Sequence, residues 1–223
     1  MKKYIIIVAG GTGSRMKSDV PKQFILLQGK PILMRTIERF THSFPDIQII
    51  VVLNAQYRDE WKSLCEKHQF NIEHTITEGG QTRFHSVKNG LALVPDNCLV
   101  GIHDAARPLV SYNTIITAFN TAEEKGNATP AVPLTESIRC LENGENKAVD
   151  RNKYSIIQTP QCIHSSDLKQ AFMQEYQSTF TDDASVLESI GKKINLIEGN
   201  KENIKITSPQ DLMLAELILS QEK

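Results

Sequence analysis

Short apolar runs alternate along the chain with longer segments in which apolar residues recur every three or four positions. The short runs fit buried strands, and the longer segments have the period of amphipathic helices. Strands that are apolar on both faces are typical of parallel sheets covered by helices on each side. The pattern predicts strands at residues 4–9, 48–53, 72–77, 98–103, 128–132 and 193–198.

The helical segments lie between these strands and after the last one. We expect helices at residues 31–41, 56–67, 83–93, 113–125, 165–175, 182–189 and 209–220. The alternation indicates an α/β fold with a mostly parallel sheet flanked by helices. With 223 residues, of which 40% are hydrophobic, the chain is long enough for one sizeable core, so we expect a single domain over residues 1–223.

Residues 135–158 depart from this alternation. They contain two short strand-like pieces, 137–141 and 154–158, joined by a polar run at 142–147. The turn residues of that run predict a β-hairpin, or arm, that projects from the main sheet. A projecting hairpin cannot bury both faces alone, so we expect the arm to form a dimer contact, with an ordinary surface excursion as the alternative.

The composition argues against several classes of protein. A formal net charge of -1 with mixed signs gives no basic stripe, so we expect no nucleic-acid partner. Only five apolar residues precede Gly10, too few for a signal peptide or a membrane span, so we expect a cytoplasmic protein without a membrane partner. The four cysteines and six histidines are dispersed, which favours reduced thiols and no transition-metal site.

A glycine-rich loop follows the first predicted strand. It contains Gly10, Gly11 and Gly13, and the cations Arg15 and Lys22 come soon after. Glycines let several backbone N–H groups turn toward an anion, so this loop favours phosphate binding. It lacks the Gly-Lys-Ser/Thr ending of a P-loop and the third glycine of a dinucleotide fingerprint. The loop therefore indicates a phosphate site of another type.

Polar residues also follow other predicted strands, where ligands gather in parallel sheets. Gly79 and Gly80 suit a close backbone approach to a ligand such as a base. Asp104 follows the fourth predicted strand, and Mg²⁺ favours one or two carboxylates together with phosphate oxygens. We expect Asp104 to bind Mg²⁺; the alternative is a structural carboxylate that caps the next turn or pairs with Arg107.

Further motifs span nearly the whole chain. They are Pro21-Lys22-Gln23, Gly79-Gly80 with Arg83, His103-Asp104-Ala105-Ala106-Arg107-Pro108, Val149-Asp150-Arg151, Thr159-Pro160-Gln161, Thr181-Asp182-Asp183-Ala184-Ser185 and Asn203-Ile204-Lys205. The glycine loop alone indicates only a nucleotidyltransferase. Together, and in this order, the motifs resemble the 2-C-methyl-D-erythritol 4-phosphate cytidylyltransferase family.

The resemblance implies transfer of CMP from CTP to 2-C-methyl-D-erythritol 4-phosphate, with release of pyrophosphate, in the non-mevalonate route to isoprenoid precursors. It also implies a Rossmann-like sheet of the nucleotidyltransferase type and Mg²⁺ as cofactor. The partners it implies are CTP, a polyol phosphate and a second copy of the chain, whose arm reaches the neighbouring site.

The resemblance also assigns roles by motif position. Arg15 and Lys22 would stabilise the transition state, while Lys205 and an Arg151 supplied by the other subunit would position the polyol phosphate. Further substrate contacts would be Arg107, Thr159 and Ser137. The CTP pocket would include Ala9, Gly10, Gly11, Gly13, Gly79, Gly80, Gln81, Ser86 and Ala105. Gln81 and Ser137 depart from residues that other members carry, which leaves the fine contacts open.

The residue inventory suits this reaction. A phosphate monoester is already an anion, so its attack on CTP needs alignment and charge neutralisation but no general base or covalent nucleophile. This agrees with a site rich in Lys and Arg and poor in His.

Two other functions stay open. The ribitol 5-phosphate cytidylyltransferase family shares the glycine loop, Pro21-Lys22-Gln23 and Asn203-Ile204-Lys205, whereas Ala105-Ala106 and Val149-Asp150-Arg151 favour the methylerythritol enzyme. A non-catalytic nucleotide-binding regulator is the second alternative, but a binding module has no need of transition-state charges.

Overall fold

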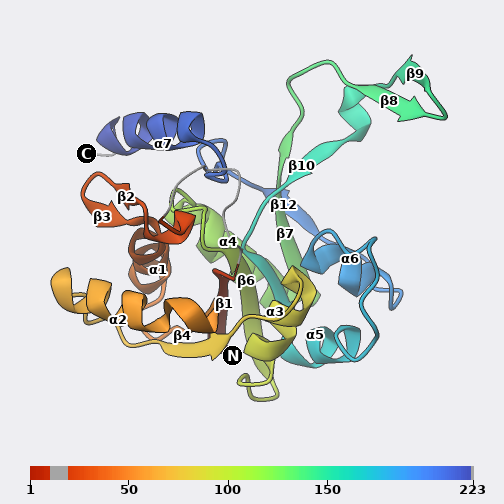
Figure 1. Ribbon diagram of the computed structural model, residues 1–223. Coiled ribbons are helices and arrows are strands. Elements are labelled where there is room, and N and C mark those ends of the chain that lie inside the picture. The colour runs from red at the N-terminus through yellow and green to blue at the C-terminus, as the bar shows by residue number, and fades with distance from the viewer. Residues whose placement is uncertain (11–19, 222–223) are drawn as a thin grey trace.

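An eight-stranded sheet forms the centre of the molecule (Figure 1). The computed structural model describes residues 1–10 and 20–221. The strand order is β10-β7-β11-β6-β1-β4-β5, and β12 also pairs with β7. The strands are β1 (Lys2–Val8), β4 (Gln48–Leu53), β5 (Thr75–Glu78), β6 (Cys98–Asp104), β7 (Asn127–Pro133), β10 (Ser155–Ile157), β11 (Gln161–His164) and β12 (Leu196–Glu198).

One half of the sheet is parallel. β1 lies between β4 and β6 and is parallel to both, and β4 is parallel to β5. The other half is mixed, because β11 runs antiparallel between β6 and β7. All six predicted strands are present, and the prediction of an α/β sheet flanked by helices is confirmed. The sequence pattern missed β11, which has four residues and polar side chains at both ends.

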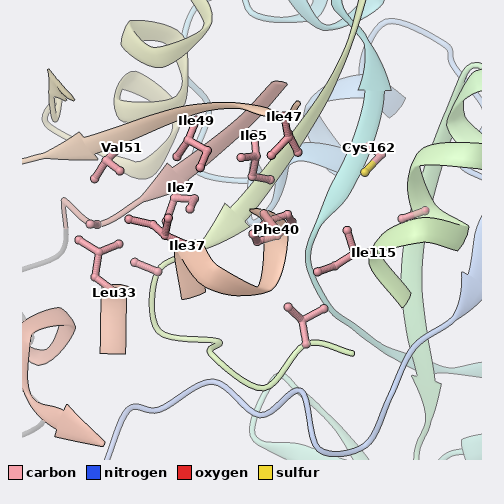
Figure 2. Close-up of a cluster of buried hydrophobic side chains, with 14 of the residues drawn as sticks. Ile5, Ile7, Leu33, Ile37, Phe40, Ile47, Ile49, Val51, Ile115 and Cys162 are labelled. Carbon is pink, nitrogen blue, oxygen red and sulfur yellow. The ribbon is translucent and has the colours of Figure 1, made fainter. Parts of the chain in front are cut away.

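Alternate side chains of β1 point into two separate cores. Ile5 and Ile7 belong to a cluster that contains Ile37 and Phe40 of the first helix (Figure 2). Ile6 belongs to the cluster on the opposite face. Side chains alternate across a strand, so an unbroken apolar run such as this one requires cover on both sides.

Helices provide that cover on both faces of the sheet (Figure 1). Helices α1, α2 and α4 contribute to the cluster of Ile5, and helices α3, α5 and α6 to the cluster of Ile6. The bounds are α1 (Ile32–Ser43), α2 (Arg58–Lys67), α3 (Arg83–Leu91), α4 (Tyr112–Lys125), α5 (Ser165–Ala171), α6 (Asp183–Glu188) and α7 (Pro209–Gln221). All seven predicted helices are present, and α7 packs beside the short hairpin of β2 (Leu26–Leu27) and β3 (Lys30–Pro31).

The pairing predicted within residues 135–158 is wrong. β8 (Arg139–Glu142) pairs with β9 (Glu145–Ala148), and the turn between them is Asn143-Gly144, with φ values of 52° and 81°. Asn-Gly is a preferred pair for such a two-residue turn. The second predicted piece instead contributes β10, which pairs with β7 in the main sheet. In Figure 1 the β8–β9 hairpin lies apart from the main sheet; we call Arg139–Ala148 the arm hairpin.

Candidate active site

The segments that follow three parallel strands meet at one edge of the sheet, where each donates a backbone hydrogen bond to a neighbouring strand. The N–H of Ala9, after β1, donates to β4 at 2.8 Å, and the N–H of Gly79, after β5, donates to β4 at 3.1 Å. The N–H of Ala105, after β6, donates to β1 at 3.1 Å. Three segments predicted to bind the nucleotide are thereby brought together.

A pocket of about 330 Å³ opens at this edge. Predicted site residues that line it are Ala9, Gly10, Lys22, Gly80, Gln81, Ser86, Asp104, Ala105 and Lys205. The rest of the lining is Val8, Gln23, Thr82, Arg83 and Ala106. The predicted site residues Gly11, Gly13 and Arg15 lie outside the described residues.

Two glycines of the pocket lie close to neighbouring atoms, and only Gly80 leaves no room for a side chain. A Cβ atom on Gly80 would lie 2.3 Å from the Cβ of His85, and one on Gly10 would lie 3.3 Å from the Oγ of Ser86. The N–H of Gly80 donates to the same Ser86 Oγ at 3.0 Å. Gly79 does not line the pocket, but a Cβ atom there would lie 3.6 Å from the Cα of Gly10. The segments after β1 and β5 are therefore in contact, and Gly80 allows the second of them to lie against His85 of α3.

Asp104, the last residue of β6, is surrounded by three cations. Lys205 Nζ lies 2.9 Å and Arg107 Nε 3.3 Å from its Oδ2, and Arg83 Nε lies 3.4 Å from its Oδ1. Burial acts to raise the pKa of Asp104, but the charges of Arg83, Lys205 and Arg107 outweigh it and hold the pKa well below its usual value. The carboxylate is therefore ionised at neutral pH, and the pairing with Arg107 that the sequence left open is present.

The segment that carries Lys205 is fixed to the segment after β6. The N–H of Ile206 donates to the carbonyl of Ala106 at 2.8 Å, and Arg107 Nη1 donates to the carbonyl of Asn203 at 2.7 Å. These bonds bring the Asn203-Ile204-Lys205 motif against the Asp104 motif. Lys205 and Asp104 thus line the pocket together, and Arg107 contacts both motifs.

The model of the 2-C-methyl-D-erythritol 4-phosphate cytidylyltransferase (IspD) family matches residues 4–221. The chain belongs to this family. A relative of that name from Bacteroides thetaiotaomicron is 49% identical over 98% of this chain and 100% of its own length. One from Bacillus velezensis is 37% identical over 100% of this chain and 97% of its own length.

The fold is also that of solved members of the family. The crystal structure of the Francisella tularensis IspD protein is 31% identical in sequence and has a TM-score of 0.81. The match covers 97% of this chain and 99% of that one. In the described part of the chain, none of the helices has the length and apolar character to span a membrane, and no three His, Cys, Asp or Glu residues are grouped to hold a metal.

Thr159, which the resemblance to the IspD family assigns to substrate, is buried next to Asp104 and does not line the pocket. Its hydroxyl oxygen accepts from the N–H of Asp104 at 3.2 Å and lies 2.9 Å from His103 Nδ1. His103 Nε2 lies 3.0 Å from the carbonyl of Arg107, which can only accept, so Nε2 carries the proton and Nδ1 accepts from Thr159. The Thr159 side chain therefore fixes the backbone of Asp104 and the ring of His103.

His103 itself was not among the predicted site residues. Burial lowers its pKa to about 4 and outweighs the opposing effects of the Arg107 carbonyl and Asp104, so the ring is neutral at pH 7. The sequence signals for this role are its place at the start of a family motif and its position beside Asp104 on a buried strand. A neutral, fully bonded ring fixes the end of β6 without adding charge.

A second unpredicted feature is the pair of Arg83 and Asp183. Arg83 Nη1 and Nη2 donate to the two oxygens of Asp183 at 2.9 and 2.7 Å, and the Asp183 side chain is 1% exposed. The same guanidinium contacts Asp104 through Nε. This arrangement links α3, α6 and β6. Both residues belong to family motifs, but their separation along the chain hides the pairing.

Four residues assigned to substrate are not part of the pocket lining: Arg107 and Thr159, which contact Asp104, and two that do not. Ser137 precedes the arm hairpin and Arg151 follows it, and both are exposed. Arg151 Nη1 donates to the carbonyl of Thr135, and Arg151 begins the short helix η4 (Arg151–Lys153). Within the single chain, therefore, these two residues do not join the cluster around Asp104.

Proposed function

We propose that this IspD-family chain transfers the cytidylyl group of CTP to 2-C-methyl-D-erythritol 4-phosphate and releases pyrophosphate, in the route to isoprenoid precursors. The observation that carries the proposal is the set of cations in one pocket: Lys22 and Lys205 line it, and Arg107 contacts Asp104 at its wall. Such a reaction brings two phosphate-bearing substrates together, and fixed cations offset their repulsion.

The chemistry needs no general base. An oxygen of the substrate phosphate forms the new bond to the α-phosphorus of CTP, and the bond from that phosphorus to the bridging oxygen of pyrophosphate breaks. We assign Lys22 and Arg15 to the charge that builds on the α-phosphate. Lys205 and Arg107 hold the phosphate of the incoming polyol.

We also propose that Asp104 binds Mg²⁺ together with the triphosphate of CTP. Mg²⁺ is usually held by one or two carboxylates plus phosphate oxygens and waters. Among the described residues that line the pocket, Asp104 is the one carboxylate, and its ionised form fits that role. Bound there, Mg²⁺ would offset part of the triphosphate charge.

We also propose that the chain forms a homodimer in which residues 135–158 of one subunit approach the pocket of the other. Each chain, with its arm, is then a single domain. The arm hairpin and its flanks expose Leu141, Tyr154 and Ile156, with Leu141 80% exposed. A dimer contact would cover such side chains. Arg151 and Ser137 would then complete the neighbouring site.

Pyrophosphate release tests the proposal. With CTP and Mg²⁺, we expect release only when 2-C-methyl-D-erythritol 4-phosphate is added, and little with ribitol 5-phosphate. The reverse preference would identify the ribitol enzyme, and CTP binding without release from either would identify a binding protein. We place the reaction in the cytoplasm, since all four cysteines are free thiols, as in a reducing compartment.

A further inference from the structure

Gln23 carries two buried polar atoms that no contact explains. It follows Lys22 in the short helix η2 (Lys22–Phe24) and lines the candidate active-site pocket. The residue is 1% exposed, and neither its Nε2 nor its Oε1 has a hydrogen-bond partner among the described residues. A buried amide without hydrogen bonds costs free energy, and native proteins keep few of them.

Other buried amides of the chain are better satisfied. Gln158 and Asn203 each leave only the oxygen unpartnered, since their nitrogens donate to backbone carbonyls at 2.9 and 2.8 Å. In Gln161, Nε2 donates to Asp182 at 2.8 Å and Oε1 accepts from a backbone N–H at 2.7 Å. Among the described side chains with a buried amide, Gln23 alone lacks both kinds of bond.

The local backbone does not depend on this amide. The next side chain, Phe24, stacks on Trp61 with ring centroids 5.8 Å apart, and the N–H of Phe24 donates to the carbonyl of Pro21 at 2.8 Å. Packing and a backbone bond therefore hold the turn that carries Lys22 and Gln23. The Gln23 carboxamide is therefore not needed to hold this turn and can form hydrogen bonds with a ligand.

We propose that Gln23 is a nucleotide-binding residue whose carboxamide forms its hydrogen bonds with oxygen atoms of CTP in this pocket. The inference rests on the proposed function, because it requires CTP to bind beside Lys22. The amide offers two donors and one acceptor, which suit phosphate oxygens or ribose hydroxyls. Since the bonds form only with the nucleotide, their free energy contributes to binding and not to folding.

The substitution Gln23→Met tests this, because methionine keeps the length and unbranched shape of glutamine without its polar atoms. We expect CTP to bind roughly 10-fold more weakly by calorimetry. We also expect the melting temperature without nucleotide to rise by roughly 2 to 4 °C, because an unsatisfied amide is removed. The matched control is Gln161→Met, which removes a fully bonded amide and is expected to lower the melting temperature.

Each outcome of these measurements supports or overturns the proposed role of Gln23. Unchanged CTP affinity in Gln23→Met, or a melting temperature that falls as in Gln161→Met, overturns the inference while the proposed function stands. A wild-type protein that does not bind CTP overturns both. Inorganic tripolyphosphate serves as a second probe: weaker binding of tripolyphosphate to Gln23→Met assigns the bonds to phosphate oxygens, and a loss confined to CTP assigns them to the nucleoside.

Discussion

The side chains around Asp104 form a compact set of opposite charges at the pocket wall. Its carboxylate accepts from Lys205 at 2.9 Å, while Arg107 and Arg83 lie 3.3 and 3.4 Å away. Lys22 lines the same pocket from η2. The proposed phosphate site therefore draws positive charge from four side chains, three of which pair with Asp104.

Lys22→Ala is expected to lower turnover by roughly 10²- to 10³-fold, the usual effect of losing one fixed group that stabilises developing charge. The measurement is steady-state pyrophosphate release from CTP, with circular dichroism to verify folding. Lys30→Ala is a matched control, because Lys30 pairs with Glu38 away from the pocket, and it should keep near-normal turnover. Near-normal turnover in Lys22→Ala would remove Lys22 from the catalytic role.

The neutral His103 predicts a dependence of stability on pH. Its pKa falls from 6.5 to about 4 on burial, so the unfolded chain takes up a proton first as the pH drops. The contribution of His103 to stability is complete above pH 6.5 and is lost toward pH 4. By linkage, this costs about 2 kcal/mol between pH 7 and pH 5.

Urea unfolding at pH 7 and pH 5 measures this effect. We expect His103→Gln to lose about 2 kcal/mol less than the wild type over that interval, since glutamine does not titrate. His42→Gln, at an exposed position, is the control and should follow the wild type. An equal pH dependence in His103→Gln and the wild type would contradict the buried neutral ring.

For individual residues, the sequence predicted which side chains follow the strands but not which side chains they bond to. Asp104 and Lys205 were predictable because the ends of parallel strands meet at one edge and the motifs mark them. The bond between His103 and Thr159 was not, since it joins residues far apart in the chain. Gln23 belongs to a family motif, but its proposed role was visible only in the structure, where its amide is buried without hydrogen-bond partners.

Helix α6 is the element that anchors Arg83. Asp182 caps its N-terminus, and Asp183 forms the two-bond pair with Arg83 at 2.9 and 2.7 Å. Asp183→Asn would leave the guanidinium with Asp104 alone, and breaking a buried ion pair from one side costs about 3 kcal/mol. The measurement is the free energy of unfolding in urea.

Asp96→Asn provides the comparison for α6. Asp96 pairs with Lys169 at the surface, where its side chain is 75% exposed, and such pairs contribute at most about 1 kcal/mol. Equal losses of stability in the two variants would mean that the Asp183 pair is no more important than a surface contact.

The predicted elements were accurate where burial left a clear pattern. The strands β1, β4 and β6 are apolar runs that any parallel sheet requires. β11 was missed because four residues with polar ends carry too little pattern. The strands of the arm hairpin were predicted with the wrong pairing because β9 is exposed throughout and polar except for Ala148, so only the Asn143-Gly144 turn marks it.

At the scale of the whole molecule, each active site of the proposed dimer contains Lys22 from one chain and Arg151 from the other. A mixture of Lys22→Ala and Arg151→Ala subunits would then contain hybrids with one intact site each. We expect recovery of up to about a quarter of wild-type activity, because half of the dimers are hybrids. Each variant alone should be nearly inactive.

The mixing experiment needs proof that subunits exchange, which differently tagged copies and co-purification supply. Hybrids that form but remain inactive would contradict a shared site and leave Arg151 to act within its own chain. A monomer at assay concentration would contradict the dimer itself.

The ion pairs of Asp104 also influence which small anions can bind in this pocket in a cell. Lys205 and Arg107 already hold a carboxylate, so an incoming anion exchanges one ion pair for another of similar strength. We expect inorganic phosphate to gain little from that exchange, whereas a sugar phosphate with further contacts gains the difference. If Lys205 and Arg107 bind the substrate phosphate as proposed, Asp104 competes with it, and we expect this competition to disfavour abundant simple anions.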